Sequence, residues 1–305
     1  MSLRPQINDL LELRHGANTI GLASRHRVNS VLAGLYLSVF RGQGMDFDEV
    51  REYQEGDEIR NMDWRVTART GVPHLKVFRE ERERAVVLAV DVGAHMQFGT
   101  RGTFKNIQAA RAAALLGWAA SASQDRVGGL LFGDHARGLR FLRPSRGRHG
   151  LWRLLRQLTE EADAHRTSVR ALQEALEKLV TSAPTGALIF VIADLNRDIG
   201  PLELPLGRLG QRHEVVLLPI DDPADHSLPA MGRVQFRSLD GEAVTINTDS
   251  RRGRDAYRER WLERRDVLGH TARRLGMPVI PLPTNEDVHQ ALVRGLRLRA
   301  RELVR

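Results

Sequence analysis

The sequence predicts an α/β protein whose central sheet is mostly parallel and is flanked by helices. Apolar runs of strand length recur along the chain, as in AVVLAVD and ALIFVIADL. Segments with helical periodicity lie between these runs, as in FKNIQAARAAALLGWAASASQ. Runs that are apolar throughout are typical of strands covered on both faces, and such strands require helices on both sides of the sheet.

The first predicted elements follow one another from residue 85. Residues 85–91 read as an apolar strand, and the Ala-rich residues 104–124 read as a helix. Residues 126–134 and 136–145 are predicted to be two strands joined by a Gly- and Asp-containing turn. This hairpin makes the predicted sheet mixed rather than purely parallel.

The second half of the chain continues the alternation. Helices are predicted at 149–162 and 168–183, strands at 187–195 and 213–222, and a β-excursion at 233–248. After this excursion come a long basic helix, the short strand 277–283 and a final helix.

Composition limits the classes of protein to consider. The chain has 305 residues and a hydrophobic fraction of 42%, enough to bury the core of a large α/β domain. It has no Cys, which excludes disulfides, zinc-thiolate sites and thiol nucleophiles. No apolar stretch reaches the roughly 18 to 20 residues of a membrane span, and the first residues lack a signal-peptide pattern. We therefore expect a soluble, cytoplasmic protein.

The positive charge is concentrated near the C-terminus. The net charge is +8, and residues 251–305 hold 14 Arg against 7 acidic residues, a net +7. A solvated helix face, an acidic partner and nucleic acid are the alternatives for this region. The long basic helix is predicted to place five apolar or aromatic side chains on one face: Tyr257, Trp261, Leu262, Val267 and Leu268.

A second basic segment, residues 140–153, combines five Arg with Phe141 and Trp152. Such a mixture of cations and aromatic rings can bind phosphate or nucleic acid. A solvated loop that leads into a helix is the alternative interpretation.

Two acidic residues stand at the ends of apolar strands. Asp91 ends the first strand, and Asp194 follows the strand at 187–195. Ligands of parallel α/β sheets bind beyond the carboxyl ends of the strands. We therefore expect Asp91 and Asp194 to lie on the same rim of the sheet.

Residues 46–84 differ from the rest because they are densely charged, contain interspersed aromatic residues and have two Gly-containing turns. The string VREYQEGDEIRNMDWRVTARTGVPHLKVFREERER closely resembles the signature of the DUF58 family, R-x-Y-x-x-G-D-x-x-R-x-x-D-W followed by A-R, K-x-F/Y and E-R/E. The resemblance continues strongly to about Leu195 and more loosely to the C-terminus. The matching residues are Arg51, Tyr53, Gly56, Asp57, Arg60, Asp63, Trp64, Ala68, Arg69, Lys76, Phe78, Glu80 and Glu81.

The resemblance implies a von Willebrand factor A-like α/β domain with a small β-rich unit. The expected division is residues 1–84, an N-terminal helical segment with the β-rich signature unit, and residues 85–305, the A-like domain with basic C-terminal helices. Proteins of this family are typically paired with MoxR-type AAA+ ATPases, which implies an adaptor or co-chaperone in the maturation of client complexes. The signature surface is expected to hold the small unit together, to bind the partner, or to do both.

In the structural interpretation, Asp57 and Asp63 would pair with Arg51, Arg60 or Arg69. Trp64 would supply buried area to a unit without a large core. In the alternative interpretation, the Arg and Trp side chains of the same surface would be anchors for a partner.

The A-like resemblance also implies a divalent-cation site of the form D-x-S-x-S, followed by a Thr and a later Asp. Asp91 matches the first position and Asp194 the last, while Thr167, or Ser168 in another register, is the candidate third residue. Gly93 and His95 occupy the positions of the two Ser, which leaves the motif degenerate. Mg²⁺ prefers oxygen ligands, so we expect no family-type Mg²⁺ site, and a softer metal bound through His95 is the remaining metal alternative.

No other motif indicates catalysis. The sequence contains no HExxH, no GxxxxGK[ST] and no GxSxG. We therefore expect a non-enzymatic protein without a cofactor, with any ATPase activity in a partner. A nucleic-acid-binding protein and a metal-binding A-like module are the alternatives.

Overall fold

The computed structural model describes residues 3–17, 46–54, 62–79, 84–133, 137–160, 170–237 and 243–302. The chain forms two compact units. The larger unit comprises residues 1–35 and 84–305, and the smaller unit comprises residues 36–83.

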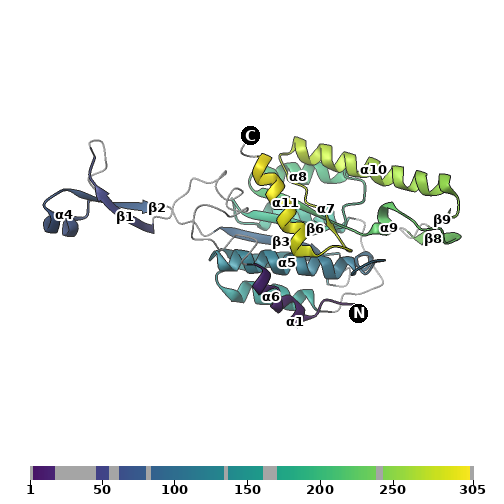
Figure 1. The fold of residues 1–305 in the computed structure, drawn as a ribbon, viewed down its shortest axis with the longest axis horizontal. Helices are drawn as coiled ribbons and strands as arrows, with labels where there is room; N and C mark the ends of the chain where they lie inside the picture. The colour runs from purple at the N-terminus through teal and green to yellow at the C-terminus, as the bar shows by residue number, and fades with distance from the viewer. Residues whose placement is uncertain are drawn as a thin grey trace. The chain divides into compact units, whose positions relative to one another are not determined.

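Six strands of the larger unit form one sheet in the order β10-β7-β6-β3-β4-β5 (Figure 1). Neighbouring strands are parallel except β4 and β5, which are antiparallel. Counted along the chain, the order is 3-2-1-4-5-6, that of a doubly wound α/β fold. The predicted fold class is confirmed. The strands are β3 (Ala85–Asp91), β4 (Arg126–Phe132), β5 (Arg140–Ser145), β6 (Leu188–Ala193), β7 (Glu214–Asp221) and β10 (Leu282–Pro283).

Helices cover both faces of this sheet. Helices α5, α6 and α11 lie on one face, and α7, α8 and α10 on the other (Figure 1). Short helical segments, η3 (Ala94–Met96), η4 (Gly200–Leu202) and α9 (Pro223–His226), follow the strand ends. The longer helices are α5 (Lys105–Ala122), α6 (Arg148–Leu158), α7 (Ala171–Ser182), α8 (Glu203–Gly210), α10 (Arg251–Arg274) and α11 (Val288–Glu302).

Strand β3 lies at the centre of the core. Every one of its residues is buried. Because side chains alternate along a strand, Val87 and Ala89 belong to the apolar cluster that includes Leu176 of α7 and Leu206 of α8. The other face packs on α5, whose Ala residues allow close approach to the sheet. This buried centre fixes the position of Asp91 at the end of β3.

The two edges of the sheet are irregular. The antiparallel edge strand β5 contains Pro144, and its register with β4 shifts between Val127 and Gly129. A Cβ at Gly128 would lie 2.6 Å from the Pro144 nitrogen, so Gly permits this approach. The opposite edge strand, β10, has two residues and ends in Pro283. It is shorter than the predicted strand at 277–283; only a single bridge, Leu217 with Val279, precedes it.

Helix α10 buries only part of the predicted face, because Tyr257, Trp261 and Leu268 lie on its inward side but Leu262 and Val267 do not. Leu268 and Ala272 are buried, whereas Leu262 is 42% exposed and Val267 is 50% exposed. The prediction for Leu262 and Val267 is therefore wrong. Each is adjacent in sequence to a residue of the inward face, Trp261 or Leu268, and neighbours in a helix are about 100° apart around its axis. Beyond its N-terminal end lies the hairpin of β8 (Arg233–Arg237) and β9 (Ala243–Asn247), the predicted β-excursion.

The N-terminal helices belong to the larger unit. Helices α1 (Ile7–Glu12) and α2 (Arg14–Ala17) pack against α5. Leu10 is buried, and the Trp118 indole N–H donates to its carbonyl oxygen at 2.9 Å. This arrangement differs from the predicted division, which grouped these helices with the signature segment.

Among the residues of the smaller unit that the structure describes, an antiparallel pair of strands and one helix are formed. Strand β1 (Asp46–Glu52) pairs with β2 (His74–Arg79), and α4 (Trp64–Thr70) lies between them in sequence. Gly71 ends α4 in the left-handed conformation, with φ of 75°.

Candidate functional site

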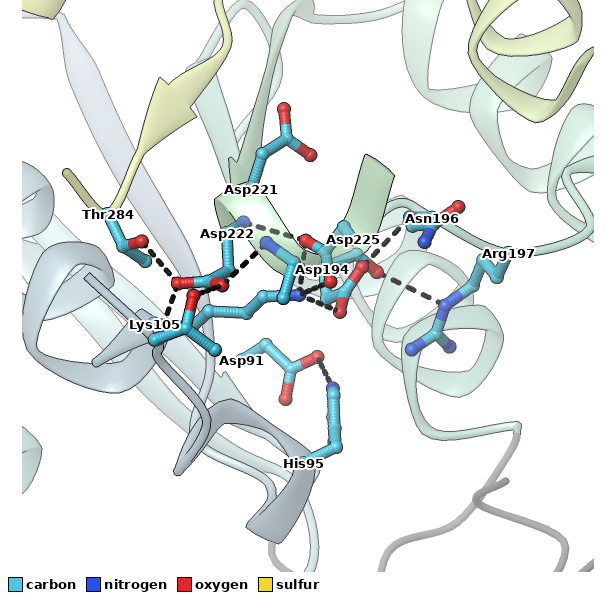
Figure 2. Close-up of polar contacts among 12 residues, drawn as sticks. Asp91, His95, Lys105, Asp194, Asn196, Arg197, Asp221, Asp222, Asp225 and Thr284 are labelled. Atoms are coloured by element: carbon cyan, nitrogen blue, oxygen red, sulfur yellow. Dashed lines mark hydrogen bonds and ion pairs between the residues drawn. The ribbon is translucent and has the colours of Figure 1, made fainter. Parts of the chain in front are cut away.

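The polar side chains of the larger unit gather at the carboxyl ends of β3, β6, β7 and β10 (Figure 2). Strands β3 and β6 are neighbours, and chain connections leave them in opposite directions. Such a switch point is where doubly wound sheets bind ligands. Asp91 and Asp194 both lie at this rim.

Asp91 is engaged by its own loop. It is 2% exposed, and its Oδ1 accepts a hydrogen bond from the Gly93 backbone N–H at 3.0 Å. Its Oδ2 lies 2.9 Å from Nε2 of His95. A Cβ at Gly133, after β4, would lie 2.5 Å from Asp91 Oδ1, so only Gly lets this segment approach so closely. Asp91 therefore accepts hydrogen bonds from the turn that follows it.

Asp194 pairs with a cation, Lys105, the first residue of α5. The Lys105 side chain is 2% exposed, and Nζ lies 2.7 Å from Asp194 Oδ2. The same ammonium lies 2.8 Å and 3.0 Å from the two carboxylate oxygens of Asp225 in α9. Asp194 Oδ1 accepts from the Asn196 backbone N–H at 2.9 Å. One buried ammonium therefore joins α5, the segment after β6, and α9.

The pKa values in this cluster reflect the balance between burial and charge. Burial lowers the pKa of Lys105, but Asp194 and Asp225 outweigh it, and the net direction is upward. Burial raises the pKa of Asp194, yet the charge of Lys105 leaves it below its usual range. For Asp225, burial dominates and the pKa is raised. Lys105 is thus charged at neutral pH, and Asp194 is its more strongly ionised partner.

Asp222 is a second buried carboxylate at the rim and is fully inaccessible to solvent. It accepts from Thr100 Oγ1 at 2.5 Å, the Thr100 N–H at 2.8 Å and Thr284 Oγ1 at 2.6 Å. It also caps α9 through the Ala224 N–H at 2.9 Å. Burial raises its pKa, but the hydrogen bonds from Thr100 and Thr284 outweigh burial and lower it. Asp222 therefore fixes the loops after β3 and β10 to the end of β7.

Helix α10 is attached to the same rim. Arg265 forms a salt bridge with Asp221, the last residue of β7, and its guanidinium lies 5.0 Å from the centre of the Trp261 ring. The Tyr257 hydroxyl donates to the Ala224 carbonyl oxygen at 3.0 Å. These contacts explain why the inward face of α10 contains Tyr257, Trp261 and Arg265.

The divalent-cation site implied by the resemblance does not fit these residues. Gly93 has no side-chain oxygen, Asp91 accepts from protein donors through both oxygens, and Lys105 contacts Asp194. A Cβ at Gly93 would lie 2.8 Å from the His95 ring, so a Ser there would require that ring to move. Within the described ranges, no group of three His, Asp or Glu side chains could hold a metal ion.

The signature residues of the smaller unit have identifiable local roles. Asp63 is the N-cap of α4, and its Oδ1 accepts from the N–H groups of Arg65 at 3.0 Å and Val66 at 3.1 Å. Trp64 is 67% exposed, so the expectation that it supplies buried area is wrong. The Arg51 guanidinium donates to the Glu52 carbonyl oxygen at 3.1 Å, and the Tyr53 N–H donates to the Pro73 carbonyl oxygen.

Several other candidate residues have side chains that the structure does not describe. Lys76 lies in β2, but its side chain is outside what the structure describes. The candidates that lie outside the described residues altogether are Gly56, Asp57, Arg60, Glu80, Glu81, Thr167 and Ser168.

Sequence reasoning missed Lys105 and Asp225. One signal was available for Lys105, because α5 contains only one other charged residue, Arg111. A cation at the start of a helix is disfavoured by the helix dipole, so a buried one needs an anionic partner. Asp225 gave no such signal, because acidic residues in a DDPADH turn are typical of ordinary helix caps.

The larger unit is a von Willebrand factor A-like α/β domain. This class is indicated by its strand order, its antiparallel edge strand and the polar rim at its switch point. None of the described helices combines the length and the apolar character needed to cross a membrane.

Comparisons with known proteins identify the family. The family model "Protein of unknown function DUF58" matches residues 49–267. The uncharacterized proteins Mb1516 of Mycobacterium bovis and Rv1480 of Mycobacterium tuberculosis are each 31% identical over 303 residues, 98% of this chain and 93% of theirs. The uncharacterized protein MAV169 of Mycobacterium avium is 28% identical over 158 residues, 51% of this chain and 91% of its own. The chain belongs to the DUF58 family.

Two solved structures are also similar. BatB from Bacteroides thetaiotaomicron has a TM-score of 0.43 and 14% identity, and the match covers 72% of this chain and 99% of BatB. The SpRpn10 VWA domain has a TM-score of 0.38 and 10% identity, with 70% and 94% covered.

Proposed function

We propose that the protein is a cytoplasmic, non-enzymatic adaptor or co-chaperone that binds a MoxR-type AAA+ ATPase during maturation or assembly of client protein complexes. The DUF58 resemblance supplies the kind of partner. The observation that carries a binding role is Trp64, which is 67% exposed within the family signature. Trp and Arg are the side chains most enriched among residues that dominate binding energy.

The surface around Trp64 suits an acidic partner. Trp64, Arg65 and Arg69 are exposed on α4, and we call these three residues the α4 face. The Asp63 cap and the Gly71 end hold this short helix at both termini. A rigid aromatic side chain loses little conformational freedom on binding, and the two guanidiniums complement carboxylates of a partner.

The larger unit supports a binding role rather than catalysis. Its rim carboxylates contact Lys105, His95, Thr100, Thr284 and Arg265 of the same chain. These contacts occupy the rim carboxylates, which would otherwise be candidates for acid–base chemistry. We propose that any ATP hydrolysis occurs in the partner.

Co-purification of the full chain with the co-expressed ATPase tests the proposal. Trp64→Ala is expected to weaken the complex by about 2 kcal/mol or more, roughly thirtyfold in Kd. Trp152→Ala is the matched control, because Trp152 is 45% exposed on α6 of the larger unit. Equal retention of the two variants would contradict the role of the α4 face. Failure of the wild-type pair to associate, with or without nucleotide, would contradict the adaptor function.

The nucleic-acid alternative has a specific observation of its own. Trp152 is exposed on α6 together with Arg148 and Arg156. Glu160 opposes this alternative, because it pairs with Arg137 at 2.5 Å and Arg140 at 3.3 Å and reduces the local positive charge. A gel-shift series at increasing salt concentration tests the nucleic-acid alternative, since nucleic-acid binding through this surface falls steeply with salt. No retention at low salt removes the alternative.

A further inference from the structure

Lys105 is the centre of a charged cluster within the larger unit. Its ammonium lies within 3.0 Å of three carboxylate oxygens, one from Asp194 and two from Asp225. The two acidic residues follow different strands, β6 and β7, and converge on one point (Figure 2). The Lys105 side chain is 2% exposed, whereas those of Asp194 and Asp225 are 19% and 11% exposed, so the ammonium is buried and the carboxylates are mostly buried.

Two carboxylates in such a place require a positive charge. Like charges at close range in a water-poor site repel strongly, and each buried carboxylate loses hydration that only a partner can replace. A divalent cation could supply that charge with oxygen ligands alone. In this chain the charge comes from a covalently attached side chain instead.

Asp91, the acidic residue at the end of β3, has hydrogen-bond partners of its own. It has His95 and the Gly93 N–H as partners. The carboxylates at the ends of β3 and β6 are therefore not bridged by one ion, as they would be in a shared cation site. Each has its own internal partner.

We propose that Lys105 is an internal cation that takes the place of a divalent metal ion at this rim and gives the rim one fixed geometry in the absence of Mg²⁺ or Ca²⁺. The ammonium clamps the start of α5, the segment after β6, and α9 together.

Thermal unfolding of the full chain tests this assignment. The Tm of the wild type is expected to be the same in EDTA and in millimolar Mg²⁺ or Mn²⁺. Lys105→Ala should lower the Tm and open a space facing two carboxylates. Mg²⁺ or Mn²⁺ at a hundredfold excess over its Kd should then raise the Tm of this variant by about 5 °C or more.

Two matched variants complete the design. Lys105→Ala with Asp225→Asn removes one of the two ligands and should show no rise in Tm with Mg²⁺ or Mn²⁺. Lys178→Ala, at an exposed position of α7, should behave as wild type. Stabilisation of the wild type by the metal, or no response of Lys105→Ala, would overturn the proposal.

Amine labelling of the wild type tests the proposal without any variant, so it can be used even if Lys105→Ala does not fold. The chain has three lysines, Lys76, Lys105 and Lys178. In the native wild type, Lys105 should label far more slowly than exposed Lys178, and its rate should be unchanged by EDTA or Mg²⁺. Faster labelling of Lys105 in Mg²⁺ would mean that the ion displaces the ammonium, which would refute the internal-cation role.

Discussion

Replacement of Asp222 by Ala is expected to cause a large loss of stability. Its carboxylate is fully buried and accepts four hydrogen bonds, two from Thr100, one from Thr284 and one from Ala224. A hydrogen bond to a charged group contributes about 1.5–3 kcal/mol, and donors left unsatisfied in the interior add to the cost. Because such contributions are not additive, we expect a decrease of about 4 kcal/mol or more in the free energy of unfolding.

Urea denaturation followed by circular dichroism measures this change. Thr284→Val removes one donor to the carboxylate and should cost about 1.5–3 kcal/mol. Thr248→Val is its control, since Thr248 is also buried but its hydroxyl has only neutral partners: it donates to the Gly232 carbonyl oxygen and accepts from the Met231 N–H. Each of these neutral hydrogen bonds should contribute only about 0.5–1.5 kcal/mol. A loss below about 1 kcal/mol for Asp222→Ala would refute the reasoning, since no single hydrogen bond of this kind is worth less.

The pH dependence of the same variant follows from the lowered pKa of Asp222. A carboxylate with a depressed folded pKa stabilises the fold fully above its unfolded value of about 3.9. That contribution is lost as the pH falls through the folded pKa. The difference in unfolding free energy between wild type and Asp222→Ala should therefore be constant near neutral pH and shrink below about pH 4.

Two further predictions concern a tyrosine and a pair of glycines. Burial and the charge of Asp225 raise the pKa of Tyr257 to about 12, so its stabilising contribution holds below about pH 10 and is lost as the pH rises towards 12. Tyr257→Phe should abolish this late tyrosinate transition in an absorbance titration, and a titration unchanged by the substitution would contradict the assignment. Gly117→Ala should destabilise the protein by about 1–3 kcal/mol, because its Cβ would lie 2.4 Å from Leu151 Cδ1. Gly269→Ala, with nothing within 4 Å, should instead stabilise α10 by about 0.5–1 kcal/mol, and equal effects in urea denaturation would contradict the packing argument.

The fold was predictable because apolar runs and helical segments alternate along the chain. Strand β3 was predicted with its observed bounds, Ala85–Asp91, because its burial on both faces leaves a continuous apolar signal. Boundaries near turns were less well predicted. The strand predicted from residue 136 begins at Arg140, since alternation in sequence does not reveal where pairing with β4 starts.

The candidate site was predictable only in part, for a physical reason. Asp91 and Asp194 are marked by the strands that they follow, so their common rim could be inferred from the sequence. Their partners were not marked in this way. Lys105 reaches Asp194 across 89 positions and Asp225 across 120, and no periodicity encodes contacts between such distant segments. The sequence left Trp64 open between a buried position and a partner-binding one, because an aromatic residue in a short segment is compatible with either.

The irregular edges of the sheet limit how other chains can join it. An exposed strand edge is a template for pairing with a further strand, which leads to strand addition or aggregation. Pro144 in β5 and Pro283 in β10 each remove a backbone donor, and β10 is only two residues long. Recognition by β-augmentation is therefore disfavoured at both edges of the six-stranded sheet, and a partner or a second copy that binds the larger unit there would dock through side chains on helices and loops.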